Sequence, residues 1–315
     1  MSAVVIAPGE IKFEQRPIPK PGPKEVLVKM QGCGLCASNI PLWEGREWFS
    51  YPRSAGEPGH EGWGIVMDKG ERISQYKLGD RVALLYGKAF AEYVVVNQEV
   101  LIKLPVELDD MPFPGEALGC IMNILDRSHI VAGETVAVLG LGFIGMGLVQ
   151  MLANHGVNII AVSRREEALH QVEDLVRHQI KSVGKMQVIS EINEITDGRG
   201  CERIIECTGH QIGLDIGTDS IAEYGKLIIA GYHQDGLRKV DMQKWNWKAI
   251  DIINAHERNP IRYREGIEAA IEASRSGLLQ PEKLLTHSYP FDKLAEAMDN
   301  LAAGNPDMVK SYILF

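Results

Sequence analysis

The hydrophobic positions in the first part of the chain form short runs that favour β-strands. Each run is bounded by proline or glycine, and the clearest cover Glu25–Met30, Gly62–Met67, Arg81–Leu85 and Tyr93–Asn97. Residues 17–23 (PIPKPGP) and the Gly79-Asp80 pair are turn signals, because proline and glycine interrupt extended segments. The pattern predicts a small β-rich domain, which we expect to be a barrel.

Beyond about residue 120 the pattern changes to an alternation of apolar strands and helical stretches. The strands are near-continuous runs of Val, Ile and Leu at Thr135–Leu139, Asn158–Val162, Arg203–Glu206, Lys226–Ala230 and Ile250–Ile253. Such runs are typical of a parallel sheet with helices on both faces. The chain then continues with a predicted helix at Tyr263–Ser276, a short strand, a second helix at Phe291–Gly304 and a final β-type run at Ser311–Phe315.

Composition narrows the classes of function. The chain has 315 residues, which suits two domains, and 33 basic against 42 acidic side chains give a net charge of −9. This acidic balance disfavours binding to nucleic acid. Five scattered cysteines are not a disulfide framework, and no segment reads as a signal peptide or a membrane span. We therefore expect a cytoplasmic protein without nucleic-acid or membrane partners.

The first strand of the alternating region leads into a glycine-rich turn. Gly140, Gly142 and Gly145 form the pattern G-x-G-x-x-G, which predicts a tight turn, a close approach to a pyrophosphate and close packing of helix on strand. The following helix, predicted at Met146–His155, would supply free N–H groups to the anion, and we include Phe143 and Ile144 among the cofactor-binding residues. The turn predicts a Rossmann domain, a doubly wound parallel sheet that binds a dinucleotide.

The end of the second strand of that domain indicates which dinucleotide binds. NAD sites usually place a carboxylate there, but this chain has Ser163, Arg164 and Arg165. A hydroxyl and two guanidinium groups suit a 2′-phosphate, so we expect NADP(H) in preference to NAD(H). In the alternative interpretation, both arginines are solvated surface charges.

Several motifs, in order, resemble the medium-chain dehydrogenase/reductase family. They are found at Gly32–Asn39 (GCGLCASN), Gly59–Gly62 (GHEG), Gly115–Gly119 (GEALG), Ala89–Val96 (AFAEYVVV) and Glu206–Gly209 (ECTG). The resemblance extends over almost the whole chain. It implies a GroES-like β-barrel catalytic domain at 1–121, a Rossmann NADP(H)-binding domain at 122–262, and a return to the catalytic domain at 263–315.

The resemblance also implies one catalytic zinc ion, held by Cys36, His60 and Glu116. Thiolate, imidazole and carboxylate are suitable zinc ligands, and three of them leave a position open for substrate. Ser38 would carry the substrate proton, and Glu61 would tune the metal from beyond its ligands. Taken singly, Cys36 could be a buried apolar residue, His60 a satisfied loop histidine and Glu116 an acid at a helix N-terminus.

Further positions follow from the same resemblance. Cys207 and Thr208 would line the nicotinamide, Gly231 would end the next strand beside it, and Lys310 would place a cation near the pyrophosphate. The strand at Ile250–Ile253 matches the edge through which many relatives pair their sheets. We therefore expect a homodimer or homotetramer.

Four departures from the family pattern stand out. The segment Leu84–Lys88 is short and lacks the four cysteines of a structural zinc lobe, so no structural zinc is expected. Asn39 replaces the aspartate that usually orients the ligand histidine, which predicts a less tightly held metal. Pro41 replaces a histidine often found in a proton relay. The segment Pro41–Pro58 is rich in aromatic residues and arginine, and either shapes the substrate site or packs as an ordinary loop.

These expectations predict a zinc-dependent oxidoreductase acting on an alcohol/carbonyl pair, with a polar polyol or cyclic substrate favoured. A zinc-free NADPH quinone or alkene reductase of the same fold is an alternative, against which the presence of Cys36, His60 and Glu116 argues. A non-catalytic redox sensor that binds NADP(H) is a second alternative, and nothing in the sequence demands it.

Overall fold

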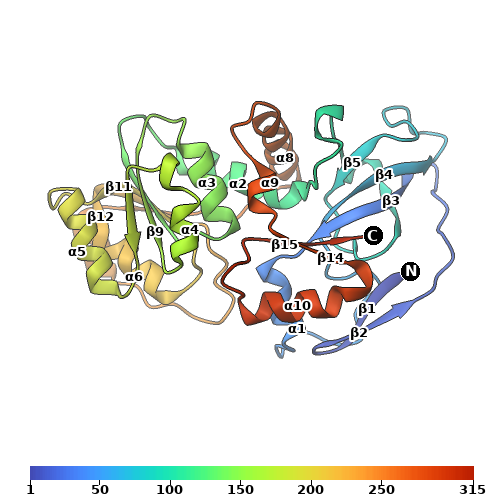
Figure 1. Cartoon of the computed structure of the whole chain (residues 1–315), viewed down its shortest axis with the longest axis horizontal. Coiled ribbons are helices and arrows are strands. Elements are labelled where there is room, and N and C mark those ends of the chain that lie inside the picture. The colour runs from blue at the N-terminus through green and yellow to red at the C-terminus, as the bar shows by residue number, and fades with distance from the viewer. The chain divides into compact units, whose positions relative to one another are not determined.

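The computed structural model describes the whole chain, Met1–Phe315, as two compact units. Unit 1 consists of Met1–Gly119, Tyr263–Gly277 and Pro281–Phe315, and unit 2 of Cys120–Arg262 and Leu278–Gln280. Figure 1 shows that unit 1 is coloured from both ends of the chain, whereas unit 2 has the middle colours. The ranges 1–121, 122–262 and 263–315 remain our proposal for the functional domains.

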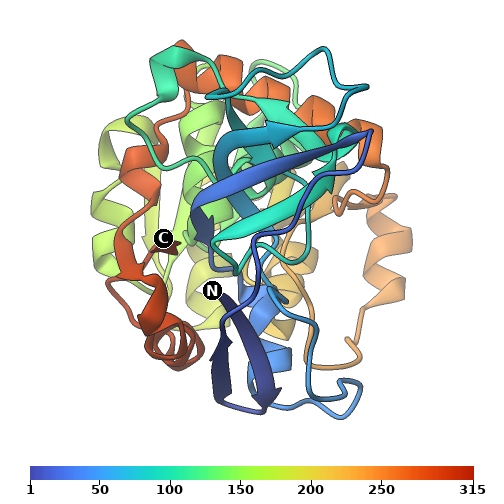
Figure 2. The same ribbon diagram turned by 90° about the vertical axis from the view of Figure 1, so that its right-hand side faces the viewer.

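Unit 1 is built on a seven-stranded, mostly antiparallel sheet and a separate hairpin. The sheet has the order β14-β15-β3-β4-β5-β7, with β6 also paired to β3. Its strands are β3 (Glu25–Gly34), β4 (Glu61–Lys69), β5 (Arg81–Leu84), β6 (Tyr93–Asn97), β7 (Leu101–Lys103), β14 (His287–Pro290) and β15 (Ser311–Leu314). The hairpin of β1 (Ser2–Ala7) and β2 (Glu10–Glu14) is dark blue in Figure 2.

The helices of unit 1 are short at its start and longer near its end. They are α1 (Ile40–Trp43), the first turn of α2 (Gly115–Ser128), α8 (Pro260–Arg275), α9 (Pro281–Leu284) and α10 (Leu294–Ala303). Single 3₁₀ turns occur at Ala37–Asn39, Gln98–Val100, Val106–Leu108 and Phe291–Lys293. The Trp43 indole N–H donates to Asp299 Oδ1 over 2.9 Å, which joins α1 to α10.

Strand β3 organises unit 1 because it pairs with β4, β6 and β15. Its alternate residues Val26, Val28 and Met30 are buried in the apolar core. A Cβ atom on Gly32 would lie 2.1 Å from the Trp63 ring, so only glycine allows this tryptophan to cross the strand. The end of β3 is thereby fixed directly before the Cys36 loop.

Unit 2 contains a six-stranded parallel sheet in the order β10-β9-β8-β11-β12-β13. Its strands are β8 (Thr135–Leu139), β9 (Asn158–Ser163), β10 (His178–Lys181), β11 (Cys201–Glu206), β12 (Ile221–Ile229) and β13 (Asp251–Asn254). In chain order this is 3-2-1-4-5-6, the order of dinucleotide-binding Rossmann domains, with a switch of direction between β8 and β11. The predicted doubly wound parallel sheet is confirmed.

Helices alternate with these strands, as the apolar pattern predicts. They are the remainder of α2, α3 (Phe143–Leu152), α4 (Glu166–His170), α5 (Lys185–Ile195), α6 (Gln211–Ser220) and α7 (Met242–Lys248), with a 3₁₀ turn at Glu173–Leu175. Strand β10 was not predicted, because only Ile180 of its four residues is buried. Helix α3 begins at Phe143 and not at the predicted Met146.

None of the helices combines the length and the apolar character needed to cross a lipid bilayer.

Candidate active site

Cys36 lies in the loop after β3, where Asn39 fixes its backbone. The Cys36 N–H donates to Asn39 Oδ1 over 3.0 Å, and the buried Asn39 amide donates to the Pro58 carbonyl over 3.3 Å. One side chain therefore connects the loop of Cys36 to the segment that enters β4.

His60 directly precedes β4, and its ring orientation is defined by two contacts. Its Nδ1 donates to the Pro58 carbonyl over 2.9 Å, because a carbonyl oxygen can only accept. Its Nε2 then carries no proton in the neutral ring, and it lies 3.4 Å from Ser38 Oγ. Nε2 is thus the nitrogen that faces Ser38, and it can bind a metal when the ring has lost its Nε2 proton.

Glu61 is the first residue of β4, and its carboxylate is buried. A Cβ atom on Gly34 would lie 1.9 Å from Glu61 Oε2, so the glycine leaves the space that this carboxylate occupies. The Lys310 ammonium donates to Glu61 Oε1 over 2.8 Å and to the Leu35 carbonyl over 3.0 Å. Glu61 Oε2 accepts no hydrogen bond of normal geometry, although the ammonium lies 2.8 Å away.

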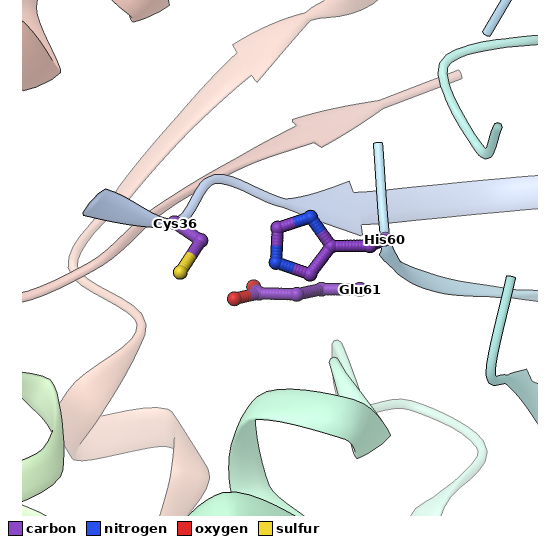
Figure 3. A group of neighbouring side chains, drawn as sticks. All are labelled: Cys36, His60 and Glu61. Atoms are coloured by element: carbon purple, nitrogen blue, oxygen red, sulfur yellow. The ribbon is translucent and has the colours of Figure 1, made fainter. Parts of the chain in front are cut away.

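The side chains of Cys36, His60 and Glu61 converge, and Figure 3 shows them pointing toward one another. One ligand atom from each lies within 4.8 Å of the other two. Sulfur, imidazole nitrogen and carboxylate oxygen form a donor set typical of zinc, and the Glu61 carboxylate already has the Lys310 ammonium as its counter-charge. The residues therefore fit a zinc ion.

The electrostatics of the group favour positive charge. Burial lowers the pKa of His60, but Cys36, Glu61 and Glu116 outweigh burial and raise it to about 10. Burial also lowers the pKa of Lys310, and the charges of Glu61, Cys36 and Glu116 more than compensate, so its pKa is raised. Cys36, Glu61 and Glu116 therefore give the site a negative potential, which a divalent cation would neutralise.

The other candidates of unit 1 surround this group without joining it. Glu116, predicted as the third ligand, lies in the first turn of α2 and influences His60 and Lys310 through its charge. The three ligand atoms that lie within 4.8 Å of one another belong to Cys36, His60 and Glu61, and the role of Glu116 as the third ligand stays a prediction. Cys33 is fully buried, and burial raises the pKa of its thiol, which agrees with a packing role.

The structure changes the interpretation of two predicted residues. Lys310 is buried, and its ammonium binds Glu61 and the Leu35 carbonyl of unit 1, while its expected place near the pyrophosphate stays a prediction. Asn39 was expected to stand in for an aspartate on the ligand histidine. Instead, it and His60 share one acceptor, the Pro58 carbonyl.

The arginines of the segment between Pro41 and Pro58 contact other residues of the same segment. Arg46 pairs with Glu44 at 2.9 Å, and Arg53 pairs with Glu57 at 2.7 Å while its guanidinium lies 5.9 Å from the Phe49 ring centre. These contacts agree with the alternative of ordinary loop packing.

In unit 2, the glycine-rich turn has the geometry that the motif predicts. Gly140 has a φ of +95°, which favours glycine. A Cβ atom on Gly145 would lie 2.0 Å from the Gly140 carbonyl oxygen, whereas one on Gly142 would meet nothing within 4 Å. Helix α3 begins directly afterwards with Phe143 and Ile144, so its free N–H groups face the turn.

The candidates for the 2′-phosphate lie beside this turn. Ser163 ends β9, and its Oγ accepts the Arg165 N–H over 3.1 Å. The Arg165 guanidinium donates to the Leu141 carbonyl over 2.6 Å, and Arg164 is exposed. One arginine is thus attached to the turn and the other is open to solvent.

Cys207, Thr208 and Gly231 lie at the carboxyl ends of β11 and β12, as predicted. A Cβ atom added to Gly140 would lie 2.8 Å from Thr208 Cγ2, and one added to Gly231 would lie 2.3 Å from the Gly209 nitrogen. These loops therefore meet at the switch point of the sheet, where dinucleotides bind.

Sequence reasoning missed three contributions to these sites. The Pro58 carbonyl is a backbone atom, which a motif of side chains does not reveal. The pairing of Lys310 with Glu61 joins residues 249 apart. The partners of the buried Glu206 carboxylate, which include His233, were also not predicted, although a charged residue at the end of an apolar strand is a signal that could have been followed.

Comparisons with known proteins agree with both units. Residues 22–106 match the family model of the alcohol dehydrogenase GroES-like domain, and residues 144–272 match that of zinc-binding dehydrogenase. The chain is 24% identical to a sorbitol dehydrogenase of Halalkalibacterium halodurans, over 94% of each chain.

Solved structures give the same result for the fold. A 2R,3R-butanediol dehydrogenase from Bacillus subtilis superposes with a TM-score of 0.86 at 25% identity, covering 100% of this chain and 99% of that one. A structure described as a zinc-binding dehydrogenase of Sinorhizobium meliloti 1021 bound to NADP gives a TM-score of 0.84 at 23% identity, covering 100% and 98%.

Proposed function

The chain belongs to the zinc-type medium-chain dehydrogenase/reductase family of oxidoreductases, and from that premise we propose that it transfers a hydride between NADP(H) and an alcohol/carbonyl pair with the help of one zinc ion. The observation that carries this proposal is the convergence of Cys36, His60 and Glu61 within 4.8 Å. A bound zinc ion would polarise the substrate oxygen as a Lewis acid.

The protein's own residues would divide the remaining work. Cys36 and His60 would hold the ion, with Glu61 or Glu116 as the carboxylate ligand. Ser38 lies within reach of His60 Nε2 and would exchange the proton of the substrate hydroxyl. Lys310 would hold Glu61 in place through its buried ion pair.

The choice of NADP(H) rests on the groups after β9. Ser163, Arg164 and Arg165 offer a hydroxyl and two cations, and no carboxylate that would repel a 2′-phosphate follows the strand directly. Arg165 is already held against the glycine-rich turn, which would fix its distance from the pyrophosphate.

For the substrate we propose a polyol or another polar alcohol. The named activities of the sorbitol and butanediol dehydrogenases agree with this class. We further propose a homodimer or homotetramer, since β13 forms an edge of the sheet and Ile252 on it is exposed. A cytoplasmic location remains a prediction.

The proposal is tested by metal analysis together with activity on a panel of alcohols and polyols, with NADP⁺ and NAD⁺ compared. Cys36→Ala should lose bound zinc and on the order of 10³-fold in kcat/KM, because the ligand set is broken. Cys201→Ala, which removes a buried thiol from the core of unit 2, should retain both and serves as the matched control.

Other outcomes identify the alternatives. Unchanged activity in Cys36→Ala would reject the zinc mechanism and favour a metal-free reductase. Tight NADPH binding without turnover of any alcohol or carbonyl would favour a redox sensor. A kcat/KM with NAD⁺ about tenfold above that with NADP⁺ would overturn the cofactor assignment.

A further inference from the structure

The fully buried Glu206 carboxylate lies at the end of β11 in unit 2. Its Oε1 accepts the Thr208 N–H over 2.7 Å, the Gly209 N–H over 3.0 Å and the Thr208 hydroxyl. Its Oε2 lies 3.0 Å from His233 Nε2, and His233 belongs to the loop that follows β12. A buried charge is costly unless such bonds satisfy it, so this carboxylate joins two loops that end neighbouring strands.

The hydrogen bonds of His233 define its tautomer. Arg238 Nε donates to His233 Nδ1 over 2.8 Å, and a guanidinium can only donate, so Nδ1 carries no proton. Nε2 must then be protonated and donate to Glu206. The ring is neutral and acts as donor on one side and acceptor on the other.

Arg238 closes the network. Its Nη2 donates to the Gly209 carbonyl over 2.8 Å and pairs with Asp235. Glu206, His233 and Arg238, which we name the loop clasp, thus connect the β11 loop to residues 231–238 at two points, His233 to Glu206 and Arg238 to Gly209. The neighbouring Gln234 Oε1 is buried without a hydrogen bond, an acceptor that a bound ligand could satisfy.

The loop clasp lies next to the switch point of the Rossmann sheet. Thr208, whose N–H donates to Glu206, packs against Gly140 of the glycine-rich turn, so closely that a Cβ atom on Gly140 would lie 2.8 Å from Thr208 Cγ2. The first half of the sheet, β8 to β10, carries the turn and Ser163, which serve the pyrophosphate and the adenosine ribose. The second half, β11 to β13, is therefore left for the nicotinamide half of the cofactor.

We infer that His233 is a positioning residue for the nicotinamide end of the cofactor. The loop clasp holds the loops after β11 and β12 in one arrangement, on which the nicotinamide ring would rest. Fewer conformations of these loops are then lost when the cofactor binds, so the entropic cost of binding is lower. The inference rests on the proposed NAD(P)(H) dependence. It concerns the nicotinamide alone and predicts no effect on binding of the adenosine half.

The test measures dissociation constants of the intact protein for NADPH and for 2′-phospho-ADP-ribose, which lacks the nicotinamide. His233→Leu removes both hydrogen bonds and should raise the Kd for NADPH about tenfold, while the Kd for 2′-phospho-ADP-ribose stays within about twofold. His233→Gln keeps a donor and an acceptor and should restore most of the NADPH affinity.

Two further variants keep the test decisive if His233→Leu folds poorly. Arg238→Met leaves the bond of His233 to Glu206 and should raise the Kd for NADPH about threefold. His155→Leu replaces an exposed histidine after α3, at the opposite end of the sheet, and should change neither constant.

The outcomes separate the hypotheses. Equal weakening of both ligands in the His233 and Arg238 variants would make the network merely structural and overturn the inference, as would unchanged NADPH binding in all variants. A wild-type protein that binds neither NADPH nor NADH would instead overturn the proposed function, on which the inference depends.

Discussion

At the scale of single residues, Asn39 shows how an amide, where the family usually has an aspartate, supports a candidate metal ligand. Its carbonyl oxygen accepts the Cys36 N–H, and its NH₂ group donates to the same Pro58 carbonyl that accepts from His60. The family's aspartate could make the first bond but has no proton for the second when ionised. The surroundings of this position are therefore adapted to the amide.

Restoring the aspartate should for this reason be harmful. Asn39→Asp places a carboxylate against the Pro58 carbonyl, and we expect zinc affinity to fall about tenfold, as is usual when a group that orients a ligand is lost. Competition with a chelator of known affinity measures the change. Affinity at or above that of the wild type would mean that the carboxylate reaches His60 directly, and would refute this account of Asn39.

The parts of the candidate site that the sequence predicted are local. Cys36, Ser38, His60 and Glu61 occur in two short motifs, and the structure places them together because β3 and β4 are neighbours. The pairing with Lys310 depends on β15 lying beside β3, a long-range contact that no motif encodes.

At the scale of elements, two glycines in the segment formed by β8, the glycine-rich turn and α3 have different structural roles. The position of Gly145 is closed by the Gly140 carbonyl, whereas Gly142 faces open space. The sequence pattern alone treats both as parts of one motif.

This difference predicts opposite behaviour of two alanine variants. Gly145→Ala must shift the backbone and should destabilise the protein by about 1–3 kcal/mol. Gly142→Ala should leave the melting temperature nearly unchanged but weaken NADPH binding, because its methyl group would project into the path of the pyrophosphate. Thermal unfolding and a fluorescence titration measure the two effects. A loss of stability in Gly142→Ala equal to that in Gly145→Ala would contradict the distinction.

Most strands could be predicted because burial on both faces demands continuous apolar runs, as in β8 and β9. Strand β10 is at the sheet edge with one buried residue, so its composition carried no such signal. Helix α3 begins earlier than predicted, because Gly145, just before the predicted start, is a poor helix former whose place in the helix is fixed by its close packing on the Gly140 carbonyl.

At the scale of the whole molecule, the exposed apolar side chains of unit 2 bear on assembly. Tyr224, Trp247 and Ile252 on β12, α7 and β13 are exposed, and β13 leaves one edge of its sheet unpaired in the single chain. Unpaired edges and apolar patches are features that proteins commonly cover.

If β13 is the site of self-association, Ile252→Lys should convert the proposed dimer to a monomer, because a charge would be buried at the edge. Light scattering over a range of concentrations measures the mass, and Val183→Lys, an exposed apolar position after β10, is the matched control. A wild-type mass equal to one chain at every concentration would exclude the proposed assembly.

The discontinuous path of unit 1 bears on how the protein is made. Strand β3 is synthesised early, but its partner β15 comprises residues 311–314, and Lys310 directly precedes it. Because domains fold as units during synthesis, unit 2 has its whole sheet available before unit 1 does. The buried Glu61 carboxylate consequently lacks its counter-charge until translation has reached Lys310, so a nascent chain stalled shortly before that codon should hold a complete Rossmann sheet in unit 2 while the candidate active site of unit 1 is still incomplete.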